Sequence, residues 1–345
     1  MKNRSKVLVA VALLGLVILG VFAYFISNII LADNTTFDED VKYVYIRKTD
    51  DFTAVVKKLE PLLDNIDYFQ LVADKKKYQV KSGKYPIEKG MNNNEVINSL
   101  RSRNTPVRLQ FSYEKSISSL SQTLSKQIAI DAESIYKTLT DSTFLEKNDL
   151  NRKTVSAIFL PNTYEIYWDI TAEDLRDRLY REYDNFWNAD REKKLENLEF
   201  SKIDASTLAS IVRKETSQLE EADRIAGVYI NRLEKGIPLQ ADPTVIFAMQ
   251  RQSEEPLEIK RVLTEDLKID SPYNTYQNRG LPPGPICIPE ISYIKAVLNY
   301  EQHDYYYFAA DPEDPGFHNF AKTLRQHNRN ARKYRRWMNE QKVYR

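Results

Sequence analysis

The chain has 345 residues, which is enough for two or more domains with a sizeable core. Its 50 basic and 49 acidic residues nearly cancel, which argues against a general polyanion-binding protein and against a nucleic-acid partner. Only the tail from Arg325 to Arg345 is locally basic. We interpret this tail as a solvated terminal helix, in preference to a site for anionic lipid or wall polymers.

An apolar segment lies near the N-terminus. Residues 7–26 carry no charge and are long enough to cross a hydrocarbon core as one helix. Lys2, Arg4 and Lys6 precede the segment and several acidic residues follow it, so the positive-inside rule predicts a cytoplasmic tail at 1–6 and an extracytoplasmic remainder. A signal-peptide cleavage site is not clear. We therefore expect a retained single-pass anchor in the cytoplasmic membrane.

A linker and a small domain are predicted next. Residues 27–42 are polar and lose periodicity, which is typical of a linker. Residues 43–106 alternate between strand and helix patterns and are predicted to form a small α+β domain. Asn92, with Glu95 three residues later, has the capping-box pattern that starts a helix. The expected elements are strands at 42–48 and within 76–88 and a helix at 51–63.

The remainder of the chain, residues 107–345, is predicted to be a larger mixed domain. Its helical patterns are joined by strands and loops, so the fold class is α+β. The expected helices are 116–128, 132–140, 172–187, 206–235, 243–251 and 290–301.

An acid on an apolar helix face is the strongest sign of chemistry. In LASIVRKET (208–216), Leu208, Ile211 and Val212 form one face of a helix. Glu215 falls on the same stripe. A carboxyl group in apolar surroundings has a raised pKa and can hold a proton near neutral pH, as a general acid requires. The alternative is a structural ion pair with a nearby arginine; the candidates are Arg213, Arg224 and Arg232.

Long sequence blocks surround this acid. They are FLPNTYE (159–165), AGVYINRLEKGIPLQADPTVIFAM (226–249), SPYNTYQNRGLPPGPICIP (271–289) and YYYFAADPEDPGFHNFAKTLRQHN (305–328). Over essentially the whole chain, the sequence resembles the MltG (YceG-like) family of membrane-anchored endolytic murein transglycosylases. The resemblance implies that Glu215 is both catalytic acid and catalytic base, that peptidoglycan is the substrate, and that peptidoglycan synthases (penicillin-binding proteins) are partners.

The small domain resembles a region of the same family. KSGKYPIEKGMNNNEVINSL (81–100) is similar to the LysM-like part of these proteins, and LysM modules bind the N-acetylglucosamine units of glycans. The resemblance therefore implies that residues 43–106 hold a glycan strand. The alternative is a packing domain that only spaces the active site from the membrane.

The chain departs from the family pattern at two places. The family usually has an Asn and a Gly around the proline after GLPPGPI, where this chain has Ile288, Pro289 and Glu290. It also often has a second Glu two positions before the catalytic acid, where this chain has Arg213. Glu215 is therefore the only carboxylate in its motif.

Gln240 and Asp242 in LQADPT are further candidates for the site. Asp242 could orient a sugar hydroxyl or act as the second carboxylate of a hydrolase. Asp followed by Pro and Thr is also typical of a helix start, in which the Asp side chain caps backbone N–H groups. Between these, the propensities favour the cap.

The segment SPYNTYQNRGLPPGP is predicted to be a loop, since proline and glycine interrupt it throughout. Tyr273, Asn274 and Tyr276 offer aromatic faces and an amide, which suit the apolar faces and polar edges of a sugar. We predict that they line a substrate groove, with a purely structural loop as the alternative.

Two histidines lie in the matching blocks, His318 in GFHNF and His327 in RQHN. We predict that both brace the site by hydrogen bonding. A zinc site made of these residues and Cys287 would lack any recognised ligand spacing, so we expect no metal and no other cofactor.

A single carboxylic acid in the motif favours transglycosylation over hydrolysis. Glycoside hydrolysis usually takes two carboxylates. In a lytic transglycosylase the muramic acid C6 hydroxyl attacks its own C1, so one residue serves first as acid and then as base. The leading hypothesis is an endolytic transglycosylase that cuts nascent strands between MurNAc and GlcNAc, leaves 1,6-anhydroMurNAc ends and terminates strand elongation. The alternatives are a hydrolytic muramidase and a non-enzymatic wall-binding scaffold.

Overall fold

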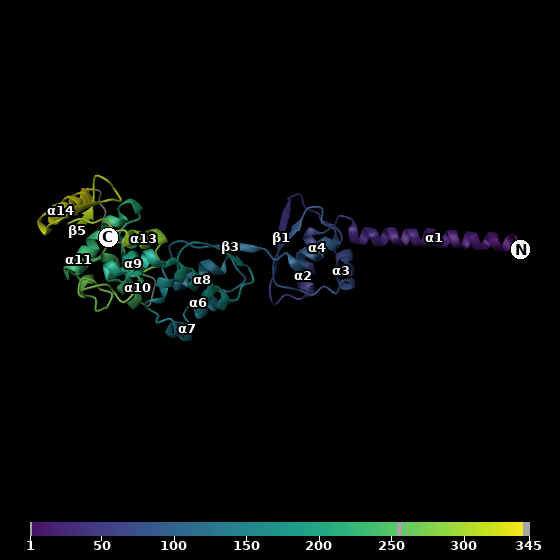
Figure 1. Ribbon diagram of the computed structural model, residues 1–345. Helices are drawn as coiled ribbons and strands as arrows, with labels where there is room; N and C mark the ends of the chain where they lie inside the picture. Colours follow the sequence, from purple (N-terminus) through teal and green to yellow (C-terminus); the bar gives the residue numbers. More distant parts are fainter. Residues whose placement is uncertain (1, 254–256, 260, 341–345) are drawn as a thin grey trace. The chain divides into compact units, whose positions relative to one another are not determined.

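The computed structural model describes residues 2–253, 257–259 and 261–340, and it divides into two compact units (Figure 1). Unit 1 comprises Met1–Leu109, Gln127–Ala129 and Glu165–Ile170, and unit 2 comprises the remaining residues. Both units mix helices with short antiparallel strands, so the α+β class predicted from the sequence is confirmed.

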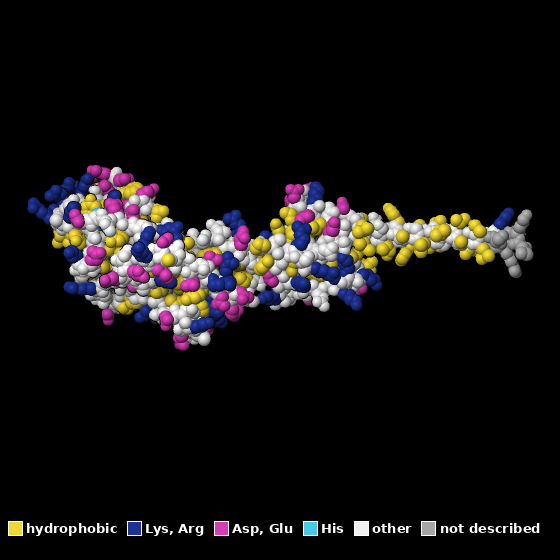
Figure 2. All heavy atoms as spheres, in the orientation of Figure 1, with side chains coloured by type: hydrophobic (Ala, Val, Ile, Leu, Met, Phe, Trp, Pro, Cys, Tyr) yellow, Lys and Arg dark blue, Asp and Glu magenta, His cyan; other side chains and the backbone are white. Residues whose placement is uncertain are grey.

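Unit 1 begins with helix α1 (Lys2–Leu31). Its stretch Lys6–Leu31 has a mean hydropathy of 2.8 and is long and apolar enough to cross a membrane. Figure 2 shows hydrophobic side chains along the part of this helix that is drawn in colour. The helix continues past the predicted end at residue 26, and Ile29 and Ile30 pack against the hydrophobic core of unit 1.

The segment predicted as a linker, residues 27–42, differs from that prediction. Beyond the end of α1, Asn34 is buried and its Oδ1 accepts a hydrogen bond of 2.8 Å from the Asn65 backbone N–H. The Asn34 Nδ2 donates to Asn93 Oδ1 at 2.6 Å, and Phe37 lies in the core. The polar side chains that suggested a solvated linker instead satisfy buried hydrogen bonds of unit 1.

The remainder of unit 1 is a two-stranded antiparallel sheet with helices. Strand β1 (Val41–Ile46) pairs with β2 (Gly83–Glu88), and Val44 lies opposite Tyr85. Residues 76–82, predicted as part of a strand, contain none. The capping box of Asn92 and Glu95 at the start of α4 is confirmed. The helices are α2 (Phe52–Leu59), the 3₁₀ helix η1 (Glu60–Leu62), α3 (Ile66–Lys75) and α4 (Asn93–Ser102).

Unit 2 is mainly helical. Its helices before the candidate acid are α5 (Ile117–Ser125), α6 (Ala132–Leu139), α7 (Ser142–Lys147), the 3₁₀ helix η2 (Val155–Ile158), α8 (Ala172–Phe186) and α9 (Ala189–Leu198). Then follow α10 (Lys202–Glu215), the 3₁₀ helix η3 (Leu219–Glu221), α11 (Ala222–Glu234), α12 (Asp242–Gln252), the 3₁₀ helix η4 (Asp266–Lys268), α13 (Ile291–Leu298) and α14 (Leu324–Glu340). The strands of unit 2 are β5 (Tyr307–Ala310) and β6 (His318–Ala321), which pair with each other. A further pair, β3 (Pro106–Gln110) with β4 (Thr163–Tyr167), has most of its residues in unit 1.

The predicted helix 206–235 is wrong as one element, because it is broken in the middle. Helix α10 ends at Glu215, and Thr216 has an extended backbone with φ −135° and ψ 146°. The chain then passes through η3 into α11. Leu208, Ile211 and Val212 are fully buried, as their spacing predicted. Glu215 therefore stands at the C-terminal end of a buried helix and not in the middle of a long one.

Candidate active site

Glu215 opens onto a pocket of unit 2. The pocket has a volume of about 900 Å³, solvent at its mouth included. Glu215 is half-buried, as expected for a side chain at the wall of an open pocket. The other lining residues come from α11, α12, α14, β5 and the loops between them: Tyr229, Arg232, Leu239, Gln240, Asp242, Tyr276, Phe308, Ala309, Ala310, His327, Ala331, Tyr334 and Arg335.

The surroundings of Glu215 keep a proton on it near neutrality. Burial raises the pKa of its carboxyl group to about 7, and the nearby charge of Asp242 acts in the same direction. A hydrogen bond from the Tyr229 hydroxyl to Glu215 Oε1, 2.6 Å long, opposes this rise. A carboxylic acid that changes charge near pH 7 can both donate and accept a proton at physiological pH.

The three arginines that could have neutralised Glu215 are engaged elsewhere. Arg213 Nε lies 2.8 Å from Glu290 Oε2, and Arg224 Nε lies 2.9 Å from Glu301 Oε2. The Arg232 guanidinium donates to the backbone carbonyls of Tyr306 and Leu239 at 2.7 and 2.5 Å. Its charge reaches Glu215 only as a weak effect that lowers the pKa. Within the described residues, Glu215 therefore forms no ion pair with Arg213, Arg224 or Arg232, and the structural alternative is wrong.

We expect Tyr229→Phe to shift the pH dependence of activity upward. The hydroxyl stabilises the ionised form of Glu215 through its hydrogen bond, so its removal raises the pKa of Glu215 above its present value of about 7. The falling limb of kcat/KM against pH, which reports the free enzyme, then moves to higher pH. Tyr183→Phe, which removes a hydroxyl from the buried Tyr183 of α8, should leave the limb in place. An unmoved limb in Tyr229→Phe contradicts the assignment of that limb to Glu215.

Asp242 is not the helix cap that its sequence context favoured. Helix α12 begins one residue earlier than that prediction requires: Ala241 occupies the cap position, and no side chain caps the helix. The Asp242 carboxylate instead accepts a 2.5 Å hydrogen bond from the Tyr276 hydroxyl and lines the pocket with Glu215. Gln240 lines the same pocket in a left-handed conformation (φ 52°), with its N–H donating to the Thr275 carbonyl at 3.1 Å.

Only one of the three residues predicted from the proline-rich loop reaches this pocket. Tyr276 lines it, whereas Tyr273 is buried with its ring 4.8 Å from that of Phe247. Asn274 is fully buried and holds the loop together. Its Nδ2 donates to the carbonyls of Leu267 and Ile269 at 3.0 and 2.9 Å, and its Oδ1 accepts from the Tyr276 N–H at 3.0 Å. Asn274 and Tyr273 are thus buried and do not line the pocket of Glu215, and their contact with sugar stays a prediction.

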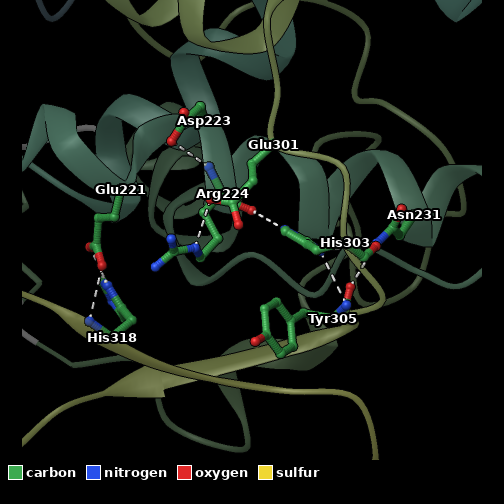
Figure 3. Close-up of polar contacts among 8 residues, drawn as sticks. All are labelled: Glu221, Asp223, Arg224, Asn231, Glu301, His303, Tyr305 and His318. Carbon is green, nitrogen blue, oxygen red and sulfur yellow. Dashed lines mark hydrogen bonds and ion pairs between the residues drawn. The ribbon is translucent and has the colours of Figure 1, made fainter.

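The two histidines have different surroundings. The Nδ1 of His318 lies 2.6 Å from Glu221 Oε1, and its backbone N–H donates to Glu221 Oε2 at 3.1 Å (Figure 3). His318 does not line the pocket, but its ring packs edge-on against Phe308, which lines it. His327 lines the pocket directly and stacks on Tyr307 at 5.3 Å. Burial lowers the pKa of His327, so the neutral imidazole is favoured there.

Helix α11 holds the β5 side of the pocket through the segment that precedes that strand. Asn231 Nδ2 donates to the carbonyls of His303 and Tyr305 at 2.7 and 2.9 Å (Figure 3). A Cβ at Gly227 would lie 2.4 Å from the Glu301 carbonyl oxygen, so only glycine permits this close approach. These contacts fix where β5 enters the pocket wall.

Several pocket residues were not predicted from the sequence. Tyr229 and Arg232 lie inside a matching block, but in one continuous helix Tyr229 would be about 21 Å from Glu215 along the axis. The break after Glu215 allows both residues to reach the pocket. The terminal helix was predicted to be simply solvated. Most of it is exposed, yet Ala331, Tyr334 and Arg335 of α14 line the pocket. Within the described residues, no group of three or more His, Cys, Asp or Glu side chains could hold a metal ion.

The fold and the site define a class of protein. It has an apolar helix near the N-terminus, two α+β units and an acid of raised pKa in an open pocket with tyrosines and arginines. Residues 44–333 match the model of the YceG-like family, and the chain belongs to this family. The resemblance inferred from the sequence blocks is thereby confirmed.

Named relatives and a solved structure agree with this family assignment. The chain is 30% identical over 270 residues to the endolytic murein transglycosylase of Bacillus subtilis (strain 168), covering 73% of this chain and 72% of that protein. It is 26% identical over 295 residues to the protein of that name from Streptococcus pneumoniae serotype 2, covering 76% of this chain but only 52% of that one. A crystal structure of a yceG-like protein from Listeria monocytogenes matches with 27% identity and a TM-score of 0.56, over 85% of this chain and 99% of that one.

The two departures from the family pattern contact each other in the structure. Arg213 and Glu290 form an ion pair at 2.8 Å, and the Arg213 guanidinium lies 4.6 Å from the ring centre of Tyr113 and 5.3 Å from that of Tyr293. The positive charge at one departure thus lies beside the negative charge at the other, and each compensates the other. Arg213 is two residues from Glu215 in the chain, but it pairs with Glu290, and Glu215 keeps its hydrogen bond from Tyr229.

Proposed function

We propose that this protein is an endolytic murein transglycosylase with Glu215 as its catalytic acid and base. The observation that carries the proposal is the acid of raised pKa in a pocket large enough for sugar rings. The names of the relatives support murein as the substrate. A purely wall-binding scaffold has no use for a half-buried acid whose pKa is raised to about 7.

The proposed reaction needs one acid and no external nucleophile. Protonated Glu215 donates its proton to the oxygen that links MurNAc C1 to the following GlcNAc, and the C1–O bond breaks. The C6 hydroxyl oxygen of the same MurNAc bonds to C1 and closes the 1,6-anhydro ring. Its proton passes to the Glu215 carboxylate, which restores the acid. No water is consumed, and the GlcNAc leaves with a free hydroxyl.

Hydrolysis is the second candidate, and Asp242 is the observation that favours it. Its carboxylate lines the same pocket as Glu215 and is held by the Tyr276 hydroxyl. A second carboxylate beside a proton donor is what a glycosidase needs to activate water or to attack C1. Tyr276 and Gln240 then serve to orient the sugar, and His318 and His327 to brace the pocket wall.

Asp242→Asn is expected to distinguish these two reactions. In a transglycosylase the variant still forms anhydro ends, because Glu215 carries the chemistry. In a two-carboxylate hydrolase it loses nearly all turnover. Because the charge of Asp242 raises the pKa of Glu215, the falling pH limb of any remaining activity should move to lower pH, opposite to the shift expected for Tyr229→Phe. Rates for the full-length protein on purified murein, measured against pH, test both statements.

We also propose that the protein is anchored in the cytoplasmic membrane by α1, with residues 1–6 inside and units 1 and 2 outside. The supporting observations are the apolar helix and the basic residues before it. In this position residues 43–106 would act as a LysM-like holder of the strand and residues 107–345 as the catalytic domain. The enzyme would cut nascent strands beside the synthases that make them and so end their elongation.

The anchor predicts the N-terminus of the mature protein. Sequencing of the protein purified from membranes should find the apolar segment 7–26 retained. A mature N-terminus near Asp33 would instead show that the segment is a cleaved signal.

A further inference from the structure

A second cavity of unit 2 is strongly basic. Lys115, Arg152, Lys153 and Arg251 line it, and we call it the basic cavity. It has a volume of about 830 Å³, solvent at its mouth included, and none of the described residues that line it is acidic. In the part of the chain that the structure describes, Lys115, Arg152 and Lys153 take part in no ion pair.

Cations gathered without counter-charges repel one another, and a concave wall concentrates their potential. A bound anion removes that repulsion. The cavity also offers hydroxyl donors from Ser116, Ser118 and Ser156. Hydroxyls together with guanidinium and ammonium groups are the donors that carboxylate and phosphate oxygens prefer. The lining therefore favours the binding of an oxyanion.

The backbone around the cavity is closely packed. A Cβ at Gly284 would lie 2.1 Å from the Lys153 carbonyl oxygen, so the proline-rich loop packs directly on the backbone beside two of the cations. On the same loop, the Ile286 N–H donates to Ser210 Oγ of α10 at 3.0 Å. The cavity is thus tied to the helix that ends in Glu215.

Helix α12 connects the basic cavity with the active-site pocket. Asp242, its first residue, lines the pocket of Glu215, whereas Phe247 and Arg251 line the basic cavity. At 1.5 Å per helical residue, Asp242 and Arg251 are separated by about 13 Å along the helix axis. Because nine residues at 3.6 per turn also place Arg251 on the opposite face of α12 from Asp242, a strand that occupies both cavities must pass around this helix.

We propose that the basic cavity binds an oxyanion carried by the glycan strand while Glu215 cleaves that strand. Two groups on such a strand have this chemistry: the terminal carboxylate of a peptide stem and the diphosphate of a lipid-linked end. The assignment to a glycan rests on the proposed function, but the anion site itself does not. Binding at the cavity lowers KM for strands that carry the anion and places their scissile bond at Glu215.

Calorimetric titration of the full-length protein tests the anion site without activity. The probes are inorganic pyrophosphate for the diphosphate and D-alanyl-D-alanine for the stem carboxylate. The double variant Arg152→Glu/Lys153→Glu should weaken binding about tenfold or more at low salt, since it replaces two attractive charges with two repulsive ones. Lys193→Glu/Lys235→Glu is the matched control, because it makes the same charge change at exposed lysines outside both cavities. Its affinity should stay within about twofold of the wild type.

The outcomes separate the sources. Binding of pyrophosphate alone assigns the diphosphate, binding of the dipeptide alone assigns the stem, and binding of both supports a general oxyanion site. Failure of both probes to bind, or an equal loss of affinity in the control variant, overturns the proposal. Arg152→Gln/Lys153→Gln repeats the test with a milder change if the charge reversal lowers the yield of folded protein.

A kinetic comparison links the site to the reaction. The ratio of kcat/KM for strands with intact stems or lipid-linked ends to that for strands lacking both should fall in Arg152→Glu/Lys153→Glu and not in the control. Anion binding without any cleavage of murein would contradict only the proposed function. Cleavage with a ratio unchanged by the variant would contradict only the role of the basic cavity.

Discussion

Replacement of Glu215 by glutamine is expected to lower murein turnover by about a hundredfold to ten-thousandfold, the usual loss when a general acid is removed. The amide keeps the shape of the side chain and can still accept the Tyr229 hydrogen bond of 2.6 Å. It cannot deliver a proton to the leaving oxygen. Initial rates for the full-length variant, compared with the wild type at the same pH, measure the effect.

Glu220→Gln is the control, because this neighbouring acid is exposed and does not line the pocket. It should retain wild-type turnover. Wild-type cleavage by Glu215→Gln would remove the acid from the mechanism and leave the non-enzymatic scaffold or a different acid as the explanation.

The same variant should change how stability depends on pH. The pKa of Glu215 rises from 4.5 to about 7 on folding, so between these values the folded state binds more protons than the unfolded state. Stability of the wild type therefore falls as the pH rises through this window, by at most about 3 kcal/mol. Glu215→Gln lacks this contribution. Its stability relative to the wild type should increase from pH 4.5 to 7 and then level off.

Replacement of Asn274 by alanine is expected to destabilise unit 2 by roughly 2–4 kcal/mol. The substitution leaves the half-buried Ile269 carbonyl and the Tyr276 N–H without this partner, and it leaves the Leu267 carbonyl with only the Gln277 side chain. Each unsatisfied buried group costs about 1–3 kcal/mol before relaxation. Denaturant unfolding of the variant measures the loss.

Gln277→Ala in the same loop is the comparison, since Gln277 is exposed and makes one exposed hydrogen bond of 3.2 Å. Its stability should change by less than about 0.5 kcal/mol. If Asn274→Ala melted like the wild type but turned over murein more slowly, Asn274 would contact the sugar after all.

Features that depend on a few neighbouring residues were predicted correctly. The capping box at Asn92 needs only Glu95 three residues later, and the buried stripe of α10 needs only helical spacing. The membrane-length apolar run follows from composition alone. The inward acid Glu215 was found because it breaks such a local pattern.

Features that depend on tertiary contacts were not predicted from the sequence. The break after Glu215 contains no proline or glycine to announce it; Thr216 takes an extended backbone, and its carbonyl accepts a hydrogen bond from Tyr293 of α13. Asp242 faces the pocket because Tyr276, 34 residues later, binds its carboxylate. Asn274 was predicted to contact sugar, but an amide side chain can equally well hold a loop together by hydrogen bonds. Its burial, which favours the second role, is a tertiary feature that the sequence does not show. The polar segment after α1 was ambiguous for the same reason.

The mass of the new chain ends tests the central claim most directly. Full-length wild-type protein is incubated with purified murein strands, and the fragments are analysed by mass spectrometry. If Glu215 acts alone with the C6 hydroxyl as nucleophile, each newly formed MurNAc end is one water lighter than a hydrolysed end. Fragments that instead carry the full mass of a reducing MurNAc end would contradict transglycosylation and assign the protein as a muramidase.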